Sequence, residues 1–116
     1  MPFDTAALTF GDVILVPFPF TDQTTSKQRP AVVISTTAYN TARPDIILMA
    51  ITSQFRASAG VGEVWLSGWQ AAGLLKPSAI KPVVATLEQR LVIRQLGSLT
   101  VDDIQALRAV IAEIIG

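Results

Sequence analysis

The chemistry open to this chain is limited by the residues that it lacks. The sequence of 116 residues contains no histidine and no cysteine. Thiol nucleophiles, the usual general base at neutral pH and the commonest metal ligand are therefore absent. The carboxylates are scattered without the spacing of a metal-binding cluster, and no glycine-rich phosphate-binding motif is present. We expect no metal and no cofactor, so any catalysis must use arginine, lysine, hydroxyl, amide or isolated carboxyl groups.

Cleavage of RNA suits this set of side chains. RNA supplies its own nucleophile, the 2′-hydroxyl beside the scissile phosphate, so an enzyme has mainly to orient the chain and stabilise a negative pentacoordinate transition state. A guanidinium group matches phosphate oxygens through two parallel hydrogen bonds. Hydroxyl and backbone N–H groups can complete such an oxyanion site. Arg29 lies where a polar loop over residues 21–28 becomes an apolar strand, so it can be both held and reached.

The elements that must position these residues are mostly short strands. Apolar, β-branched runs predict strands over residues 13–16, 31–34, 46–51, 63–66, 82–87 and 91–93. Pro17 and Pro19 indicate that the first strand ends there or lies at an edge. Residues 35–44 are expected to hold a short helical turn, and residues 69–74 a turn or short helix ended by Gly73.

The clearest helix is the last element. Thr100 is the expected N-cap, with Asp102 and Asp103 in the positive first turn. Ile104, Leu107, Ile111 and Ile114 then recur at helical spacing. Many short strands and one terminal helix predict a mainly β fold, a small barrel with helical additions.

Composition sets the broader expectations. Half of the residues are hydrophobic, so residues 1–116 can form a single domain around its own core. No signal peptide or membrane-length apolar segment is recognised in the sequence, which predicts a cytoplasmic location without membrane attachment. The formal net charge is zero, which argues mildly against binding of nucleic acid. A basic groove would have to be assembled by folding.

Three blocks of the sequence, in order, resemble the MazF/PemK-type toxins of type II toxin–antitoxin systems. The first combines Gly11-Asp12-Val13-Ile14-Leu15-Val16 with Arg29-Pro30-Ala31-Val32-Val33-Ile34-Ser35. The second is Ala50-Ile51-Thr52-Ser53-Gln54. The third runs from Leu75-Lys76-Pro77-Ser78 through Thr86-Leu87 to Leu91-Val92-Ile93-Arg94-Gln95-Leu96-Gly97. The resemblance covers nearly the whole chain.

The resemblance implies an SH3-like, CcdB/MazF-type β-barrel that forms a homodimer. It implies a metal-independent endoribonuclease, an mRNA interferase, which cuts single-stranded RNA at short sequences and leaves a 2′,3′-cyclic phosphate and a 5′-hydroxyl. The implied protein partner is a cognate antitoxin that covers the RNA groove. Operator DNA is an expected partner only together with that antitoxin.

The resemblance also implies roles for individual residues. It assigns catalysis to Arg29 and Thr52, and we expect RNA contacts from Ser53, Gln54, Lys27 and Lys81. Arginine is a poor general base, because its pKa lies above ~12. Arg29 is therefore predicted to stabilise the phosphate and to donate a proton. The base stays open between Asp22, a water molecule held by the backbone, and no specific group.

Two departures from the family pattern leave alternative functions open. Pro17 stands where many members have an acidic residue, and Pro82-Val83-Val84 stands where many have a polar residue. One alternative is a catalytically weak member that acts as a DNA-bound co-repressor with its antitoxin. The other is a poison on the same barrel that binds a topoisomerase.

Overall fold

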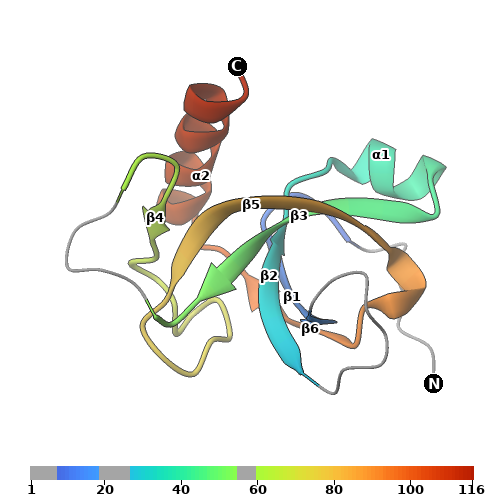
Figure 1. The fold of residues 1–116 in the computed structure, drawn as a ribbon, viewed down its shortest axis with the longest axis horizontal. Coiled ribbons are helices and arrows are strands. Elements are labelled where there is room, and N and C mark those ends of the chain that lie inside the picture. Colours follow the sequence, from blue (N-terminus) through green and yellow to red (C-terminus); the bar gives the residue numbers. More distant parts are fainter. Residues whose placement is uncertain (1–7, 19–26, 55–59) are drawn as a thin grey trace.

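The fold is one strongly curved antiparallel sheet with helices at its margins (Figure 1). The computed structural model describes residues 8–18, 27–54 and 60–116. The strands follow the order β4-β5-β3-β2-β1-β6, and each paired neighbour is antiparallel. The strands are β1 (Asp12–Pro17), β2 (Gln28–Val33), β3 (Asp45–Thr52), β4 (Val64–Trp65), β5 (Ala79–Glu88) and β6 (Arg94–Ser98). The helical elements are α1 (Thr37–Ala42), the 3-10 turn η2 (Gln89–Leu91) and α2 (Val101–Ile114).

Two irregularities in strand pairing accompany the curvature of the sheet. Between β3 and β5 the register passes from Met49–Val84 to Ile51–Ile80, so residues 81–83 lie opposite Ala50 alone. Pro82 lies in this bulge, where the missing N–H costs no ladder hydrogen bond. Between β1 and β6 a second shift leaves Leu96 as an extra residue. Bulges bend a strand and increase its twist, which favours the half-barrel shape seen here.

Both faces of β1, β3 and the second half of β2 are largely buried, which explains the continuous apolar runs in these strands. On one face Val13, Val32 and Met49 pack with α2 residues such as Leu107. On the other, the strands' alternate residues form a second cluster with Leu8, Leu87 and Val92. A strand that is half solvated alternates apolar and polar residues, whereas one that is buried on both faces does not.

Helix α2 begins as the sequence predicts. The Thr100 side chain accepts a hydrogen bond from the Asp103 N–H at 3.3 Å. The buried Asp103 carboxylate in turn accepts from the Ser67 N–H, the Ser67 hydroxyl and the Gly68 N–H at 2.9–3.1 Å. Asp103 therefore fastens the segment after β4 to the first turn of α2.

The Gly11-Asp12 pair has a structural function. Gly11 adopts φ +92°, and an added Cβ would lie 3.1 Å from Ile104. The buried Asp12 carboxylate accepts from the Thr9 N–H and from the Ser98 hydroxyl, both at 2.9 Å. This pair fixes the entry into β1 and ties it to the end of β6.

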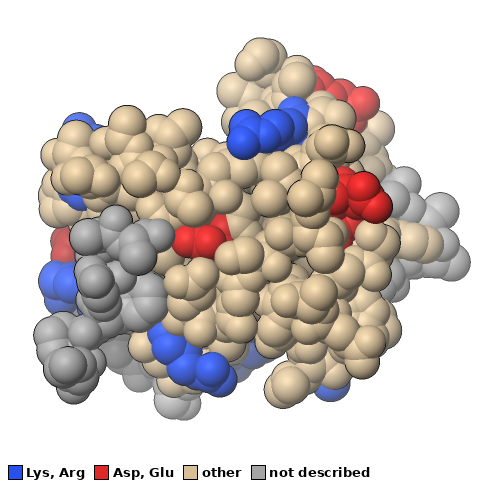
Figure 2. Space-filling model, turned by 180° about the vertical axis from the view of Figure 1, so that it is seen from behind, with Lys and Arg blue, Asp and Glu red and all other residues tan. Residues whose placement is uncertain are grey.

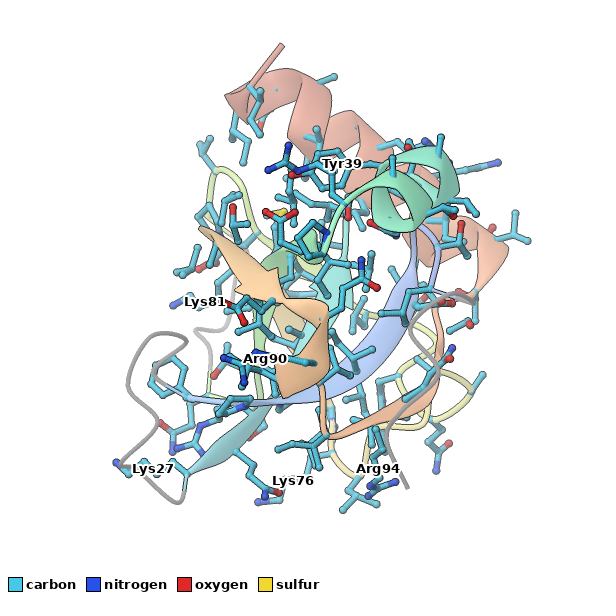
Figure 3. The ribbon with its side chains drawn as sticks, turned by 90° about the vertical axis from the view of Figure 1, so that its right-hand side faces the viewer. Lys27, Tyr39, Lys76, Lys81, Arg90 and Arg94 are labelled. Carbon is cyan, nitrogen blue, oxygen red and sulfur yellow. The ribbon has the colours of Figure 1, made fainter. Side chains whose placement is uncertain are left out.

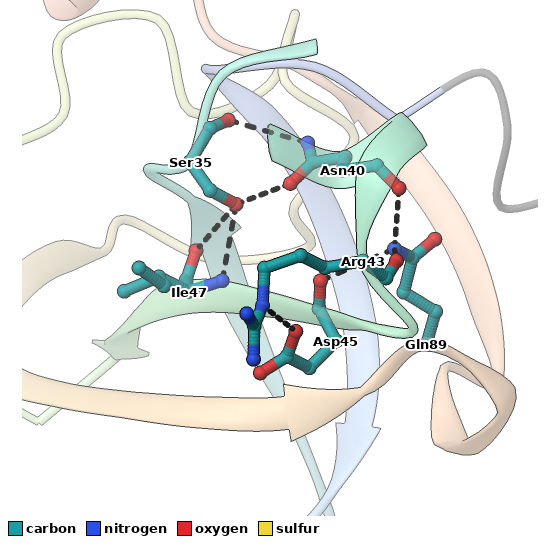
Figure 4. Close-up of polar contacts among 6 residues, drawn as sticks. All are labelled: Ser35, Asn40, Arg43, Asp45, Ile47 and Gln89. Carbon is teal, nitrogen blue, oxygen red and sulfur yellow. Dashed lines mark hydrogen bonds and ion pairs between the residues drawn. The ribbon is translucent and has the colours of Figure 1, made fainter. Parts of the chain in front are cut away.

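A buried polar network fixes the corner between α1, β3 and η2 (Figure 4). The Asn40 amide donates to the Leu8 and Ser35 carbonyls at 3.1 and 3.2 Å. The Gln89 amide donates to the carbonyls of Asn40, Arg43 and Asp45 at 2.7–3.2 Å. No buried side-chain polar atom of the described residues lacks a partner. The network lies away from the groove described below and is a fold-stabilising feature.

Most expected elements are confirmed, and one is wrong. The first strand ends at Pro17, a short helix occupies 37–42 and Gly73 closes its turn at φ +89°. The strand expected over residues 91–93 is not formed, because η2 turns the chain there and the last strand begins at Arg94. Val92 is apolar because it packs in the second core cluster.

None of the described helices is long and apolar enough to cross a membrane.

Candidate active site

An open groove lies where β2 and β3 part. Its volume is about 600 Å³. Most of the lining comes from the ends of strands and from the segment that precedes β5. The lining residues are Leu15, Gln28, Arg29, Pro30, Ile51, Thr52, Ser53, Gln54, Gly73, Leu74, Leu75, Lys76, Ser78, Arg94 and Leu96.

The groove opens because the pairing of β2 with β3 stops early. The two strands pair from Val33–Leu48 to Ala31–Ala50 and no further. Beyond that point β2 continues along β1, with Arg29 opposite Val16, while β3 continues along β5, with Thr52 opposite Ala79. Pro30 stands at the fork and has no N–H to offer a partner strand. Continuing the register from Ala31–Ala50 by two residues would bring Arg29 opposite Thr52.

Arg29 is exposed at the mouth of this fork. One terminal N–H group donates to the Gln28 carbonyl at 3.0 Å. The guanidinium carbon lies 5.8 Å from the centre of the Phe18 ring. These contacts orient the group while most of its five donors stay available to an anion.

Thr52 holds the turn at the end of β3. Its hydroxyl oxygen accepts from the Gln54 N–H at 3.0 Å, and the hydroxyl donates to the Gln54 carbonyl at 3.2 Å. The second contact is long for an O–H donor. The hydroxyl hydrogen can therefore turn towards a bound oxygen while the oxygen atom continues to hold the turn. Ser53 and Gln54 follow as exposed residues in the groove lining.

The opposite wall carries two cations that were not selected from the sequence. Lys76 precedes β5 and Arg94 opens β6, and both side chains are exposed and line the groove. Lys76 could be found only as a surface lysine within a family-like block. Arg94 became a candidate only when the pairing of β6 with β1 brought it to the same groove as Arg29.

Two other predicted RNA-binding residues, Lys27 and Lys81, do not line the groove. Lys27 precedes β2 and is exposed beside the groove-lining Gln28, but it is not itself part of the lining. Lys81 lies in the β5 bulge and forms an ion pair with Glu63 at 3.6 Å. Figure 3 shows Lys27, Lys76 and Arg94 along the lower edge of the molecule, with Lys81 higher on the sheet. The structure thus brings Arg29, Thr52, Ser53 and Gln54 together and leaves Lys81 outside.

The charged residues that the structure describes in the groove lining are all basic. Arg29, Lys76 and Arg94 line it, and no aspartate or glutamate among residues 8–18, 27–54 and 60–116 does. In the described part of the chain these three cations form no ion pair, whereas Arg43, Lys81 and Arg90 each pair with a carboxylate. On the back of the molecule the charged side chains are dispersed (Figure 2). Folding therefore gathers positive charge at the groove although the formal net charge is zero.

Among residues 8–18, 27–54 and 60–116, no group of three or more acidic, histidine or cysteine side chains could hold a metal ion. Asp22, one candidate for the base, lies outside the described residues. The arrangement can bind a phosphate through a guanidinium, present a hydroxyl to it and surround it with further positive charge.

Comparisons with solved structures show the fold. An endoribonuclease in complex with its cognate antitoxin, from a mycobacterial species, aligns over 95% of this chain and 96% of its own, with a TM-score of 0.77 and 17% identity. MazF from Deinococcus radiodurans aligns over 97% and 99%, with a TM-score of 0.69 and 23% identity. A MazE–MazF complex from the same organism covers 94% and 95%, with a TM-score of 0.70 and 22% identity.

Sequence comparison shows the family. No curated protein matches the chain. Residues 9–115, however, match the model of a toxin family, and this range includes every described residue of the groove. The expectation drawn from the Arg29-Pro30 and Thr52 blocks is confirmed at this level. The chain belongs to the PemK-like, MazF-like toxins of type II toxin–antitoxin systems.

Proposed function

We propose that this toxin is an endoribonuclease that cuts single-stranded RNA. Arg29 and Thr52 are its catalytic residues, and it needs no metal ion. The observation that carries the proposal is the fork between β2 and β3, which places these two residues on one groove whose described charged lining residues are all basic. Further support comes from the family and from the solved relatives, two of which are described as an endoribonuclease with its antitoxin and as a MazE–MazF complex.

The chemistry follows from the two side chains. The 2′-oxygen attacks phosphorus as its proton leaves to water or a base, and the bond from phosphorus to the 5′-oxygen breaks. The Arg29 fork binds the non-bridging oxygens, where negative charge grows, and supplies a proton to the departing 5′-oxygen. The Thr52 hydroxyl donates to a second oxygen of the phosphoryl group. The products are a 2′,3′-cyclic phosphate and a 5′-hydroxyl.

The same proposal covers the partners. The toxin acts in the cytoplasm as a homodimer, and a cognate antitoxin blocks the groove. Ser53, Gln54 and Lys27 contact the RNA beside the scissile phosphate. Lys81 is not part of this contact set, because it lies outside the groove lining and is paired with Glu63. Operator DNA is bound only by the complex with antitoxin.

The direct test is incubation of the purified, antitoxin-free protein with a long single-stranded RNA in EDTA. The expected result is a set of discrete fragments with cyclic-phosphate ends, abolished by Arg29→Ala. Arg90→Ala is the matched control, since Arg90 is also exposed but is paired with Glu88 and does not line the groove. Absence of fragments from the unaltered protein contradicts the proposal. Toxicity on expression that survives Arg29→Ala would point instead to topoisomerase binding.

A further inference from the structure

We propose that Arg94, assisted by Lys76, forms a second phosphate-binding subsite, which holds a phosphate of the RNA other than the scissile one. This inference rests on the proposed function and adds to it the minimum length of substrate. A chain that occupies both subsites must extend beyond the two nucleotides that flank the cut.

Position separates Arg94 from Arg29. Leu15 of β1 pairs with Arg94 on one side and with Pro30 on the other. Two spacings between strands place the Arg94 backbone about 10 Å from that of Pro30. Arg29, meanwhile, is held by the Gln28 carbonyl and beside the Phe18 ring, at the end of the β1–β2 pair. The two guanidinium groups therefore approach the groove from opposite sides of β1.

The wall that carries Arg94 and Lys76 is held as one piece. Gly73 adopts φ +89°, and a Cβ added there would lie 2.0 Å from the Leu96 carbonyl oxygen. A Cβ added at Gly97 would lie 2.4 Å from the Ala72 carbonyl oxygen. The two glycines thus let the backbone before Lys76 lie directly against the backbone after Arg94. Such close packing fixes the two backbone segments that carry these cations relative to each other.

Charge supplies the chemical class of the ligand. Arg94 and Lys76 are exposed and form no ion pair with any described residue. A guanidinium with an ammonium nearby is suited to the two non-bridging oxygens of a phosphodiester. A competing explanation is that Arg94, on the edge strand β6, only protects that edge from pairing with other chains. In that case its removal leaves RNA binding unchanged.

The first experiment measures steady-state cleavage of a synthetic RNA that spans a cut site mapped with the unaltered protein. Arg94→Ala is expected to raise KM about tenfold and to leave kcat within about twofold. Arg94→Lys should restore part of the loss, because it keeps the charge but not the fork. Arg90→Ala, an exposed arginine outside the groove, should change neither constant. An unchanged KM in Arg94→Ala, or a loss confined to kcat, overturns the subsite.

The second experiment locates the phosphate. Copies of the same RNA carry a 2′-deoxy nucleotide at the cut, so that they bind without reacting, and a single neutral methylphosphonate at successive positions. One position other than the scissile phosphate should weaken binding to the unaltered protein about tenfold and binding to Arg94→Ala hardly at all. A uniform response at every position contradicts the proposal.

Failure of the proposed function is distinguishable from failure of the subsite. If the unaltered protein makes no cut, the endoribonuclease assignment falls. The affinity for a generic single-stranded RNA, measured in EDTA, then tests the Arg94 subsite independently of cleavage. Equal affinity of the unaltered protein and Arg94→Ala overturns the subsite. Weaker binding by Arg94→Ala, with unchanged binding by Arg90→Ala, supports it.

Discussion

Arg29 and Thr52 owe their common position to the place where two strands stop pairing. They are 23 residues apart in the sequence (52 − 29), and neither is held by the other. The fork at Pro30 leaves a gap that a phosphate can enter between a guanidinium on one strand and a hydroxyl on the other. In the proposed mechanism the charged group and the neutral donor thus have separate roles.

The role of the Thr52 hydroxyl can be separated from its methyl group. Thr52→Val keeps the shape but removes the hydroxyl, so kcat is expected to fall about 100-fold, as for loss of one donor in an oxyanion site. Thr52→Ser keeps the hydroxyl and should stay within about tenfold of the original. The measurement is kcat on the mapped RNA, with thermal unfolding as the control for folding. Equal activity of the two variants would falsify a role for the hydroxyl.

Individual site residues can be predicted from the sequence where they belong to a local motif. Arg29 and Thr52 could be predicted because each lies in a block that resembles the toxin family. Arg94 and Lys76 could not, since their place in the groove depends on the pairing of β6 with β1 and on the contact between two glycines. Lys81 was expected from the sequence to contact RNA, but it lies in a bulge and pairs with Glu63.

The elements of the fold act on the site mainly through two close backbone contacts. Gly73 and Gly97 join the segment before β5 to β6, so the second wall of the groove depends on the absence of side chains at these positions. Asp103 supports the same segment from behind by accepting hydrogen bonds from Ser67 and Gly68. The wall is therefore built from β6 and α2 together.

Substitution of Gly73 tests this dependence. Gly73→Ala forces a Cβ into the Leu96 carbonyl and into a left-handed conformation, which should cost about 3 kcal/mol of the free energy of unfolding. The expected fall in Tm is on the order of 10 °C. Gly60→Ala is the matched control, because its φ is not positive and its nearest neighbouring atom is 3.4 Å away. A fall in Tm as large for Gly60→Ala as for Gly73→Ala contradicts the explanation.

Element types were predictable where burial and local chemistry agree. Residues 13–16 and 46–51 are apolar throughout because both faces of the sheet are covered, and Thr100 caps α2 through its own side chain. Residues 91–93 are also apolar but form no strand. Leu91 and Val92 pack at a corner while Ile93 is exposed, and an apolar run does not distinguish a strand from such a corner. The strand expected over residues 82–87 is longer in the structure, where β5 spans Ala79–Glu88. Pro82 lies in a bulge and does not begin the strand.

In the molecule as a whole, the net charge differs from the local charge at the groove. The formal charge is zero, yet the described residues of the groove lining include three cations and no acid. Composition alone therefore does not reveal this local concentration of positive charge. Positive charge concentrated in a concave site attracts anions more strongly than the same charge spread over the surface.

This separation has a measurable consequence in the salt dependence of binding. Neutralisation of two phosphates on single-stranded RNA, one by Arg29 and one by Arg94 with Lys76, predicts a slope of about −1.4 for the logarithm of the binding constant against the logarithm of the salt concentration. Arg94→Ala should reduce the magnitude of the slope by about 0.7, and Arg90→Ala should leave it unchanged. Fluorescence anisotropy of a labelled, non-reacting RNA provides the measurement. A slope near zero for the unaltered protein would show that the groove cations do not contact phosphate.

The pairing of β6 with β1 also orders events during synthesis. Protein chains emerge from the ribosome from the amino terminus, and β1 and β6 lie at opposite ends of the described sheet in sequence. Arg29 is translated early, but the wall that faces it waits for Arg94. A partly made chain is still attached to its own messenger RNA while it lacks that wall. The groove therefore cannot be complete until translation has passed almost the whole described chain.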